Sequence, residues 1–239
     1  MSVLNTSLHD GILTVAINRP EKKNTLTPEV VDGIDGAIQS NRSARVIVFK
    51  GEGGFFCAGA DVSQFLNMEG KEAEAFSLRG NRLMDSIQNS DAVSIAAIRG
   101  GAYGGGFELA LSCDIRIASP DTKLGLTEIN LGIFPGFGGL RRLIEIGGKG
   151  AARYLGLTGK VLSGKEAFDL GLVTILSDDP EKAADELAAS LAVKSTHSIA
   201  RIKSLLSQEH YSEEKEAKLF GEVVETREAR EAVSKFLKR

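Results

Sequence analysis

The chain has 239 residues, of which 42% are hydrophobic and 26% are charged, and its formal net charge is −3 at pH 7. This length is sufficient for one large domain with a full hydrophobic core. Lysine and arginine are scattered along a slightly acidic chain, which lacks the basic surface that binding to a nucleic-acid backbone requires, so nucleic acid is not an expected partner.

The N-terminus and the cysteines bear on the compartment. The first six residues, MSVLNT, have neither the basic head nor the apolar stretch of a signal peptide, and no apolar run reaches the length of a transmembrane helix. Cys57 and Cys113 each lie inside an apolar run, which favours two buried thiols over a disulfide or a metal site. We therefore expect a cytoplasmic protein with no membrane partner.

The first elements alternate between strand and helix patterns. Residues 11–17 predict a strand that Arg19-Pro20 ends. Thr27 is a suitable N-cap with Pro28 in the first helical position, and apolar residues follow at helical spacing. Residues 45–50 (RVIVFK) are nearly all apolar, which predicts a strand buried on both faces before the glycine-rich turn at 51–54.

The same logic continues in the middle of the chain. Residues 94–98 predict a strand, 100–106 a glycine-rich turn, 107–113 a short helix and 114–118 another strand. This order is typical of an α/β fold, in which sites form where strands lead into helices.

After Pro135 the pattern becomes mostly helical. Residues 163–166 (SGKE) form a capping box that opens a helix, and Gly171 is placed to end it. From residue 180 to 239 the composition shifts to Ala, Glu, Lys, Leu and Ser at helical spacing, for which we expect two or three helices.

Three segments carry candidate site residues. In FFCAGADV (55–62) the small residues allow a ligand to approach the backbone, and Asp61 suits a helix N-terminus, whose amides favour negative charge. A tight turn with small residues for packing alone is equally compatible with this segment.

The second segment places Glu108 two residues after the last of three consecutive glycines, 104–106. Three glycines entering a helix are entropically costly, which indicates close backbone approach. Glu108 has apolar neighbours, and a buried carboxylate usually has a function or a partner, although a solvent-exposed carboxylate in a first helical turn is the simpler alternative.

Glu128 is the acid of the third segment, 124–139, where it lies among apolar residues before a stretch of glycine and proline. A single acid there is compatible with a structural role. Two acids, each beside a glycine-rich turn, could position one water and exchange a proton with it, as general acid/base catalysis requires.

Four segments taken in order resemble the crotonase (enoyl-CoA hydratase/isomerase) superfamily: INRPEKKNTLT, FFCAGADV, GGGFELALSCDIRIAS and EINLGIFPGFGGLRRL. The similarity runs from about residue 13 to 171 and continues weakly in EAREAVSKFLKR. It implies an α/β spiral of repeated ββα units with a helical C-terminal region. The expected division is a core with the CoA-thioester site at 1–180 and an oligomerisation region at 181–239, in a homotrimer or homohexamer.

The resemblance also implies roles for residues. The amides of Ala60 and Gly105 match the family's oxyanion hole, and Glu108 and Glu128 match the two glutamates that hold the water added to the double bond of an enoyl-CoA in fatty acid metabolism. Coenzyme A belongs to the substrate, so no separate cofactor is implied. The substrate and CoA contacts carried over are Lys22, Lys23, Leu26, Ala58, Gly59, Asp61, Val62 and Gly104.

Two departures from the family pattern leave the acyl chain open. Arg99 stands where asparagine is frequent and Gly101 where tyrosine is frequent, which suggests a wider pocket beside Gly101 with Tyr103 as a partial replacement.

Other functions remain possible to different degrees. An enoyl-CoA isomerase, a thioester hydrolase or a decarboxylase could use the same scaffold, but the presence of both glutamates favours hydration. A nucleotide-cofactor enzyme is disfavoured because the phosphate-binding glycine motifs are missing. The scattered His9, His197 and His210 disfavour a metal hydrolase, and the acidic balance disfavours a non-catalytic RNA-binding member.

Overall fold

The computed structural model describes residues 2–208 and 210–238. The strands are β1 Leu4–His9, β2 Ile12–Ile17, β3 Val46–Gly51, β4 Val93–Ile98, β5 Gly101–Tyr103, β6 Ile115–Ala118, β7 Lys123–Gly125, β8 Leu162–Ser163 and β9 Ile175–Leu176. The helices are α1 Pro28–Ser40, α2 Gly70–Gln88, α3 Gly105–Ser112, α4 Gly139–Thr158, α5 Gly164–Asp169, α6 Pro180–Ala192, α7 Thr196–Leu206, α8 Glu213–Val224 and α9 Arg227–Leu237. Short 3-10 helices include η3 Val62–Leu66 and η4 Glu128–Leu131.

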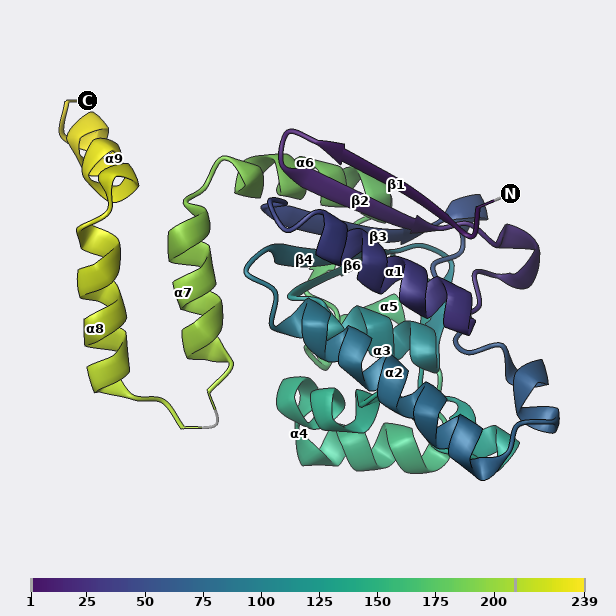
Figure 1. Cartoon of the computed structure of the whole chain (residues 1–239). Helices are drawn as coiled ribbons and strands as arrows, with labels where there is room; N and C mark the ends of the chain where they lie inside the picture. Colours follow the sequence, from purple (N-terminus) through teal and green to yellow (C-terminus); the bar gives the residue numbers. More distant parts are fainter. Residues whose placement is uncertain (1, 209, 239) are drawn as a thin grey trace.

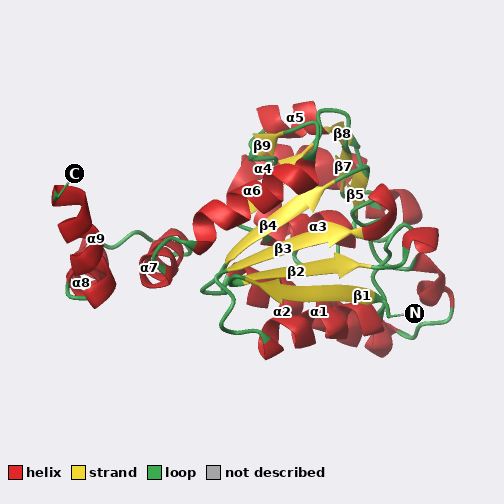
Figure 2. Cartoon of the chain, turned by 90° about the horizontal axis from the view of Figure 1, so that it is seen from above, coloured by secondary structure: helices red, strands yellow, loops and turns green. Residues whose placement is uncertain are grey.

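The main sheet has the order β1-β2-β3-β4-β6-β9. Strand β1 pairs antiparallel with β2, and the other neighbours in the sheet are parallel. Helices α1 and α2 lie on one side of this sheet and α6 on the other, as Figures 1 and 2 show. The central strands β3 and β4 are buried between these layers, which is the arrangement expected of a mostly parallel sheet.

A second, smaller sheet holds the site segments together. It has the order β5-β7-β8, and isolated parallel bridges join Leu26 to Ala60 and Cys57 to Ala102. Segment 57–60 therefore runs beside β5, with hydrogen bonds from Cys57 N to Gly101 O (3.2 Å) and from Tyr103 N to Cys57 O (3.0 Å). Two glycine-rich segments far apart in sequence become neighbours in this way.

Several local predictions are confirmed. Thr27 Oγ1 accepts a hydrogen bond from Val30 N at 3.3 Å, and Ser163 and Glu166 form the predicted capping box at the start of α5. Strand β3 is buried on both faces. The thiols of Cys57 and Cys113 are free and buried.

Two predictions about helices were wrong. Helix α3 begins at Gly105, not at Phe107, so two glycines belong to the helix itself and Gly104 is its N-cap. Residues 180–238 form four helices, not two or three, because Ser195, Ser212 and Thr226 each cap a new helix within what composition alone presents as one helical stretch.

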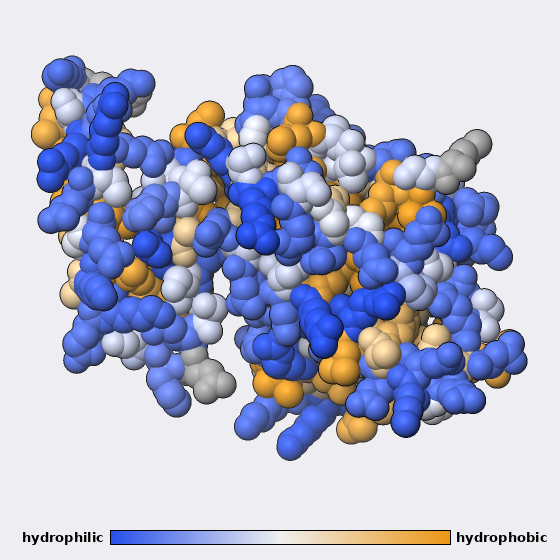
Figure 3. Space-filling model, viewed as in Figure 1, coloured by the Kyte–Doolittle hydropathy of each residue, from blue (hydrophilic) through white to orange (hydrophobic). Residues whose placement is uncertain are grey.

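Helices α7, α8 and α9 lie to one side of the body, beyond α6 (Figures 1 and 2). Lys203 of α7 ties this arm to the sheet through Asp114 Oδ2 at 2.6 Å and Ala92 O at 2.8 Å. Hydrophobic side chains reach the surface over α8 and α9, at the left of Figure 3. The most exposed are Phe220 (70%), Phe236 (75%) and Leu237 (77%).

Within the described ranges, no helix combines the length and the apolar character needed to cross a membrane.

Candidate active site

A cavity of about 660 Å³ lies beside the N-terminus of α3. Helix α2, η3, η4 and the segment 131–137 complete its wall. Eight of the residues singled out from the sequence line it: Ala58, Gly59, Ala60, Val62, Gly104, Gly105, Glu108 and Glu128.

The other four predicted contacts lie outside the wall of this cavity. Lys22 is exposed and Lys23 places its ammonium 5.7 Å from the centre of the Phe55 ring. Leu26 is fully buried and pairs with Ala60 through an isolated β-bridge. Asp61 caps η3 by accepting from Ser63 N at 3.3 Å, so its predicted capping role is confirmed.

The backbone amides of Ala60 and Gly105, which both line the cavity, are among those that have no hydrogen-bond acceptor in the described part of the chain. Gly105 is the first residue of α3, where an amide has no partner within the helix and the helix dipole favours negative charge. Gly59 has φ +93°, and a Cβ added there would lie only 3.2 Å from Gly105 N. The two amides therefore occupy adjacent segments that only glycine allows to approach so closely.

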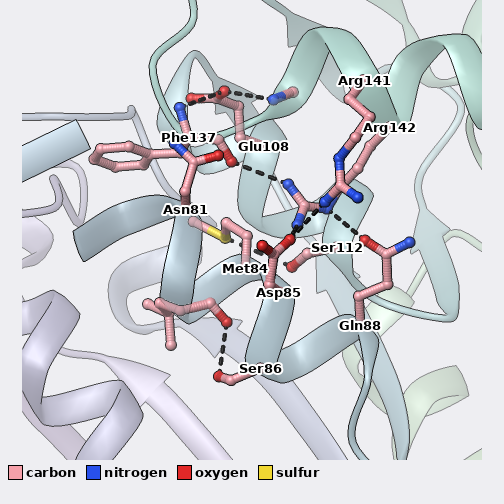
Figure 4. Close-up of polar contacts among 12 residues, drawn as sticks. Asn81, Met84, Asp85, Ser86, Gln88, Glu108, Ser112, Phe137, Arg141 and Arg142 are labelled. Atoms are coloured by element: carbon pink, nitrogen blue, oxygen red, sulfur yellow. Dashed lines mark hydrogen bonds and ion pairs between the residues drawn. The ribbon is translucent and has the colours of Figure 1, made fainter. Parts of the chain in front are cut away.

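Glu108 is held in a fixed position in the first turn of α3. Its side chain is 1% exposed, and its Oε1 accepts hydrogen bonds from Phe137 N (2.9 Å) and Gly139 N (2.7 Å) (Figure 4). Burial, followed by the charge of Glu128, raises the pKa of Glu108 to about 7. Glu108 is therefore a carboxyl group that exchanges its proton near neutral pH.

Glu128, the first residue of η4, lines the same cavity. Its carboxylate lies against Gly104, where an added Cβ would be 2.9 Å from Oε1. Its Oε2 is buried and has no hydrogen-bond partner among the described residues. Burial raises the pKa of Glu128. A buried carboxylate oxygen without a partner is costly unless a ligand or water completes it.

Sequence reasoning missed the apolar wall of the cavity. Helix α2 was not predicted, yet it contributes Phe76, and the neighbouring segments contribute Phe65, Met68, Leu131, Ile133, Phe134 and Phe137. The signal was available, because the buried residues Phe76, Gly80, Leu83, Met84 and Ile87 of α2 follow helical spacing.

The suggested widening beside Gly101 was wrong. The Phe55 ring fills that space, since a Cβ on Gly101 would lie 2.9 Å from its Cζ. Neither Gly101 nor Tyr103 lines the cavity of Glu108 and Glu128. Arg99 lines a separate polar cavity with Gly100, Ser119 and Asp121.

This arrangement combines two capacities in one cavity. The amides of Ala60 and Gly105 can donate to an oxygen that gains negative charge, and Glu108 and Glu128 can exchange protons with a water between them. Among the described residues, no three His, Cys, Asp or Glu side chains are grouped so that they could hold a metal ion.

Comparisons with known proteins agree with the segments quoted above. The family model described as enoyl-CoA hydratase/isomerase matches residues 7–239. A "Probable enoyl-CoA hydratase" of Bacillus subtilis (strain 168) is 39% identical over all of this chain and 97% of its own length. A short-chain-enoyl-CoA hydratase of Clostridium acetobutylicum is 31% identical over 95% of this chain and 92% of its own.

Solved structures with a similar fold include enoyl-CoA hydratases. The crystal structure of an enoyl-CoA hydratase from Bacillus anthracis superposes with a TM-score of 0.93 at 29% identity, over 99% of this chain and 96% of that one. The predicted α/β crotonase-like fold is thereby confirmed.

Proposed function

The chain belongs to the enoyl-CoA hydratase/isomerase family, and from that premise we propose that it adds water across the 2,3 double bond of an enoyl-CoA thioester to give a 3-hydroxyacyl-CoA. The observation that carries the proposal is the pairing of Glu108 and Glu128 in one cavity, with Glu128 Oε2 buried and without a partner in the described part of the chain. The hydratase names of two relatives with near-complete coverage support the same reaction.

In this proposal the backbone stabilises the charge that forms on the substrate. The thioester oxygen accepts hydrogen bonds from the amides of Ala60 and Gly105. Attack of water at C3 forms the C–O bond and moves the π electrons toward that oxygen as an enolate. Loss of one such donor typically lowers the rate roughly 10²–10³-fold.

The two carboxyl groups manage the protons. The attacking water lies between Glu108 and Glu128 and completes Glu128 Oε2, which has no other partner. The proton that the water releases passes through the pair to C2 as the enolate collapses. The hydration involves no net oxidation or reduction and uses only the atoms of one water, so the proposal requires no redox cofactor.

The cavity also favours an uncharged acyl group. Its wall is mostly apolar, and its charged members in the described part of the chain are Glu74, Glu108 and Glu128, all carboxylates. An acyl chain that ends in its own carboxylate would meet like charge there without a compensating cation.

The direct test is the loss of enoyl-thioester absorbance when crotonyl-CoA is mixed with the protein in plain buffer. We expect turnover with crotonyl-CoA and with longer neutral enoyl-CoAs, and slower turnover with glutaconyl-CoA. No loss of absorbance with short, long or branched enoyl-CoAs would contradict hydration and favour an isomerase or a hydrolase, which 3-enoyl-CoA and saturated acyl-CoA substrates would then reveal.

We further propose a homotrimer or homohexamer in which the arm of α7–α9 contacts other copies in the cytoplasm. The exposed Phe220, Phe236 and Leu237 support such a contact, because apolar side chains of this size are costly in water. Light scattering at micromolar concentration tests it, and a monomer there would contradict it.

A further inference from the structure

Two adjacent arginines at the start of α4 have different environments. The side chain of Arg141 is 55% exposed, whereas that of Arg142 is 1% exposed. Both reach Asp85 of α2. A fully buried guanidinium is rare and requires several acceptors, so Arg142 has a task that its neighbour does not share.

Arg142 uses three separate donors. Its Nη1 donates to Phe137 O at 3.0 Å, its Nε to Gln88 Oε1 at 2.9 Å and its Nη2 to Asp85 Oδ1 at 2.5 Å (Figure 4). Two of these acceptors belong to α2 and one to the turn that precedes α4. The rigid fork of arginine therefore connects the turn to a long, packed helix.

The backbone amides of the same turn bind Glu108. The peptide nitrogens of Phe137 and Gly139 both donate to Glu108 Oε1. Phe137 therefore donates from its nitrogen to the Glu108 carboxylate and accepts at its carbonyl from the Arg142 guanidinium. Asn81 of α2 fixes the preceding residue by donating to Gly136 O at 2.7 Å.

The glycines of this turn show how closely the groups pack. A Cβ on Gly138 would lie 2.6 Å from Arg142 Nη1, and one on Gly139 would lie 2.5 Å from Glu108 Cγ. Any displacement of the guanidinium would therefore be transmitted through the 137–139 peptides to Glu108, because no free space separates them.

We propose that Arg142, fixed by Asp85 and Gln88, is a positioning residue that sets the orientation of the Glu108 carboxylate through the 137–139 turn. The inference rests on the proposed function, since it assigns Glu108 to the reaction. It extends that function by naming a residue that never touches the substrate and acts on catalysis from behind the turn.

Arg142 also acts on Glu108 through its charge. The charged groups near Glu108 are Glu128 from η4, which raises the pKa of Glu108, and Arg142 from α4, which lowers it. Removing the cation should therefore move the Glu108 pKa upward. The amides of Phe137 and Gly139 also lower this pKa, so a displaced turn would move it in the same direction. Arg142→Lys keeps the charge and changes the geometry, whereas Arg142→Met removes both, so the difference between the two variants isolates the charge.

The experiment compares Arg142→Lys, Arg142→Met and the matched control Arg141→Met by steady-state kinetics with crotonyl-CoA across pH. We expect kcat to fall about 10²-fold in both Arg142 variants with KM changed only a few-fold, because a small misplacement of a catalytic group is enough for such a loss. The pH step of kcat/KM should move upward further in Arg142→Met than in Arg142→Lys, which keeps the charge that lowers the Glu108 pKa. Arg141→Met should resemble the wild type in both.

Asp85→Asn provides a second variant in case Arg142→Met folds poorly, since it keeps both arginines and weakens the anchor that they share at Asp85 Oδ1. We expect a loss of about tenfold in kcat. Arg141→Met controls for the loss of the Arg141 contact. If Arg142→Lys and Asp85→Asn both retain the kcat of Arg141→Met, the positioning role is wrong.

Failure of the proposed function would be recognised separately, because the wild type itself would then be inactive on every enoyl-CoA. Carboxyl-carbon NMR of Glu108 needs no turnover and still tests the inference in that event. An upward shift of the Glu108 pKa in Arg142→Met with no shift in Arg141→Met would support the coupling, and equal values in both would overturn it.

Discussion

The two faces of the cavity are built differently. On the α3 face, Glu108 is buried and its Oε1 is bound by two amides of a turn that Arg142 fixes from behind. On the η4 face, Glu128 has an oxygen without a partner among the described residues, and its neighbours Leu131 (60%) and Phe134 (76%) are largely exposed. One face is rigid and satisfied, and the other is open and incomplete.

This difference teaches how two like acids can have distinct tasks in one cavity. A carboxylate held by a packed turn keeps its direction whether or not substrate is bound. A carboxylate on a short, exposed 3-10 helix keeps a free oxygen for a water and leaves room for the acyl group to enter. Environment, more than residue type, separates the two roles.

The largest expected effect would remove the acids themselves. Glu108→Gln and Glu128→Gln should each lower kcat at least roughly 10²-fold, because neither amide can exchange a proton in its place. Binding of a CoA ester should change little, which isothermal titration with a saturated acyl-CoA measures. Near-normal turnover in either variant would show that this residue takes no part in the acid/base chemistry, and the two faces could then not be compared as catalytic partners.

The second effect is on stability and should distinguish the two faces. The pKa of Glu108 is raised from 4.5 to about 7 in the folded protein. The folded state therefore binds more protons than the unfolded state between these values, so the free energy of unfolding falls as pH rises from about 4.5 to 7. Glu108→Gln removes this dependence.

Its magnitude follows from the same shift. Between pH 4 and pH 8 the wild type should lose at most roughly 3 kcal/mol of its free energy of unfolding through Glu108. Glu108→Gln should not show this loss, so its free energy of unfolding should rise by that amount relative to the wild type. Glu128→Gln should show a smaller gain, because Glu128 is only partly buried. Urea unfolding at the two pH values measures both, and equal gains would mean that the two faces do not differ in rigidity or burial.

The parts of the site that could be predicted from the sequence are those where a residue type destabilises the local structure unless it has a function. Three glycines before Glu108, and a lone acid before Gly132, indicated close backbone approach and proton chemistry without a structure. The family resemblance then assigned the amides of Ala60 and Gly105. These features lie within short segments, so each could be interpreted locally.

The remainder depends on contacts between distant segments. Arg141 and Arg142 are identical neighbours in the sequence, and only tertiary contacts, which include those to Asp85 and Gln88 of α2, distinguish the buried one from the exposed one. The partner Asp85 lies in a helix that was not predicted. Likewise Phe55, in the loop that follows β3, fills the space beside Gly101 of β5. No local pattern carries information of this kind.

The smallest expected effect is a shift in a titration, and it tests whether the two faces interact at all. The charge of Glu128 is the second cause, after burial, that raises the pKa of Glu108. Glu128→Gln should therefore move the step of kcat/KM near pH 7 to lower pH, while burial keeps it above the ordinary glutamate range. Glu74→Gln is the matched control, because Glu74 lines the same cavity but lies at its exposed rim and is not among the groups that shift Glu108. An unmoved step in Glu128→Gln would show that the acids titrate independently, and a single water shared between them would then no longer be tenable.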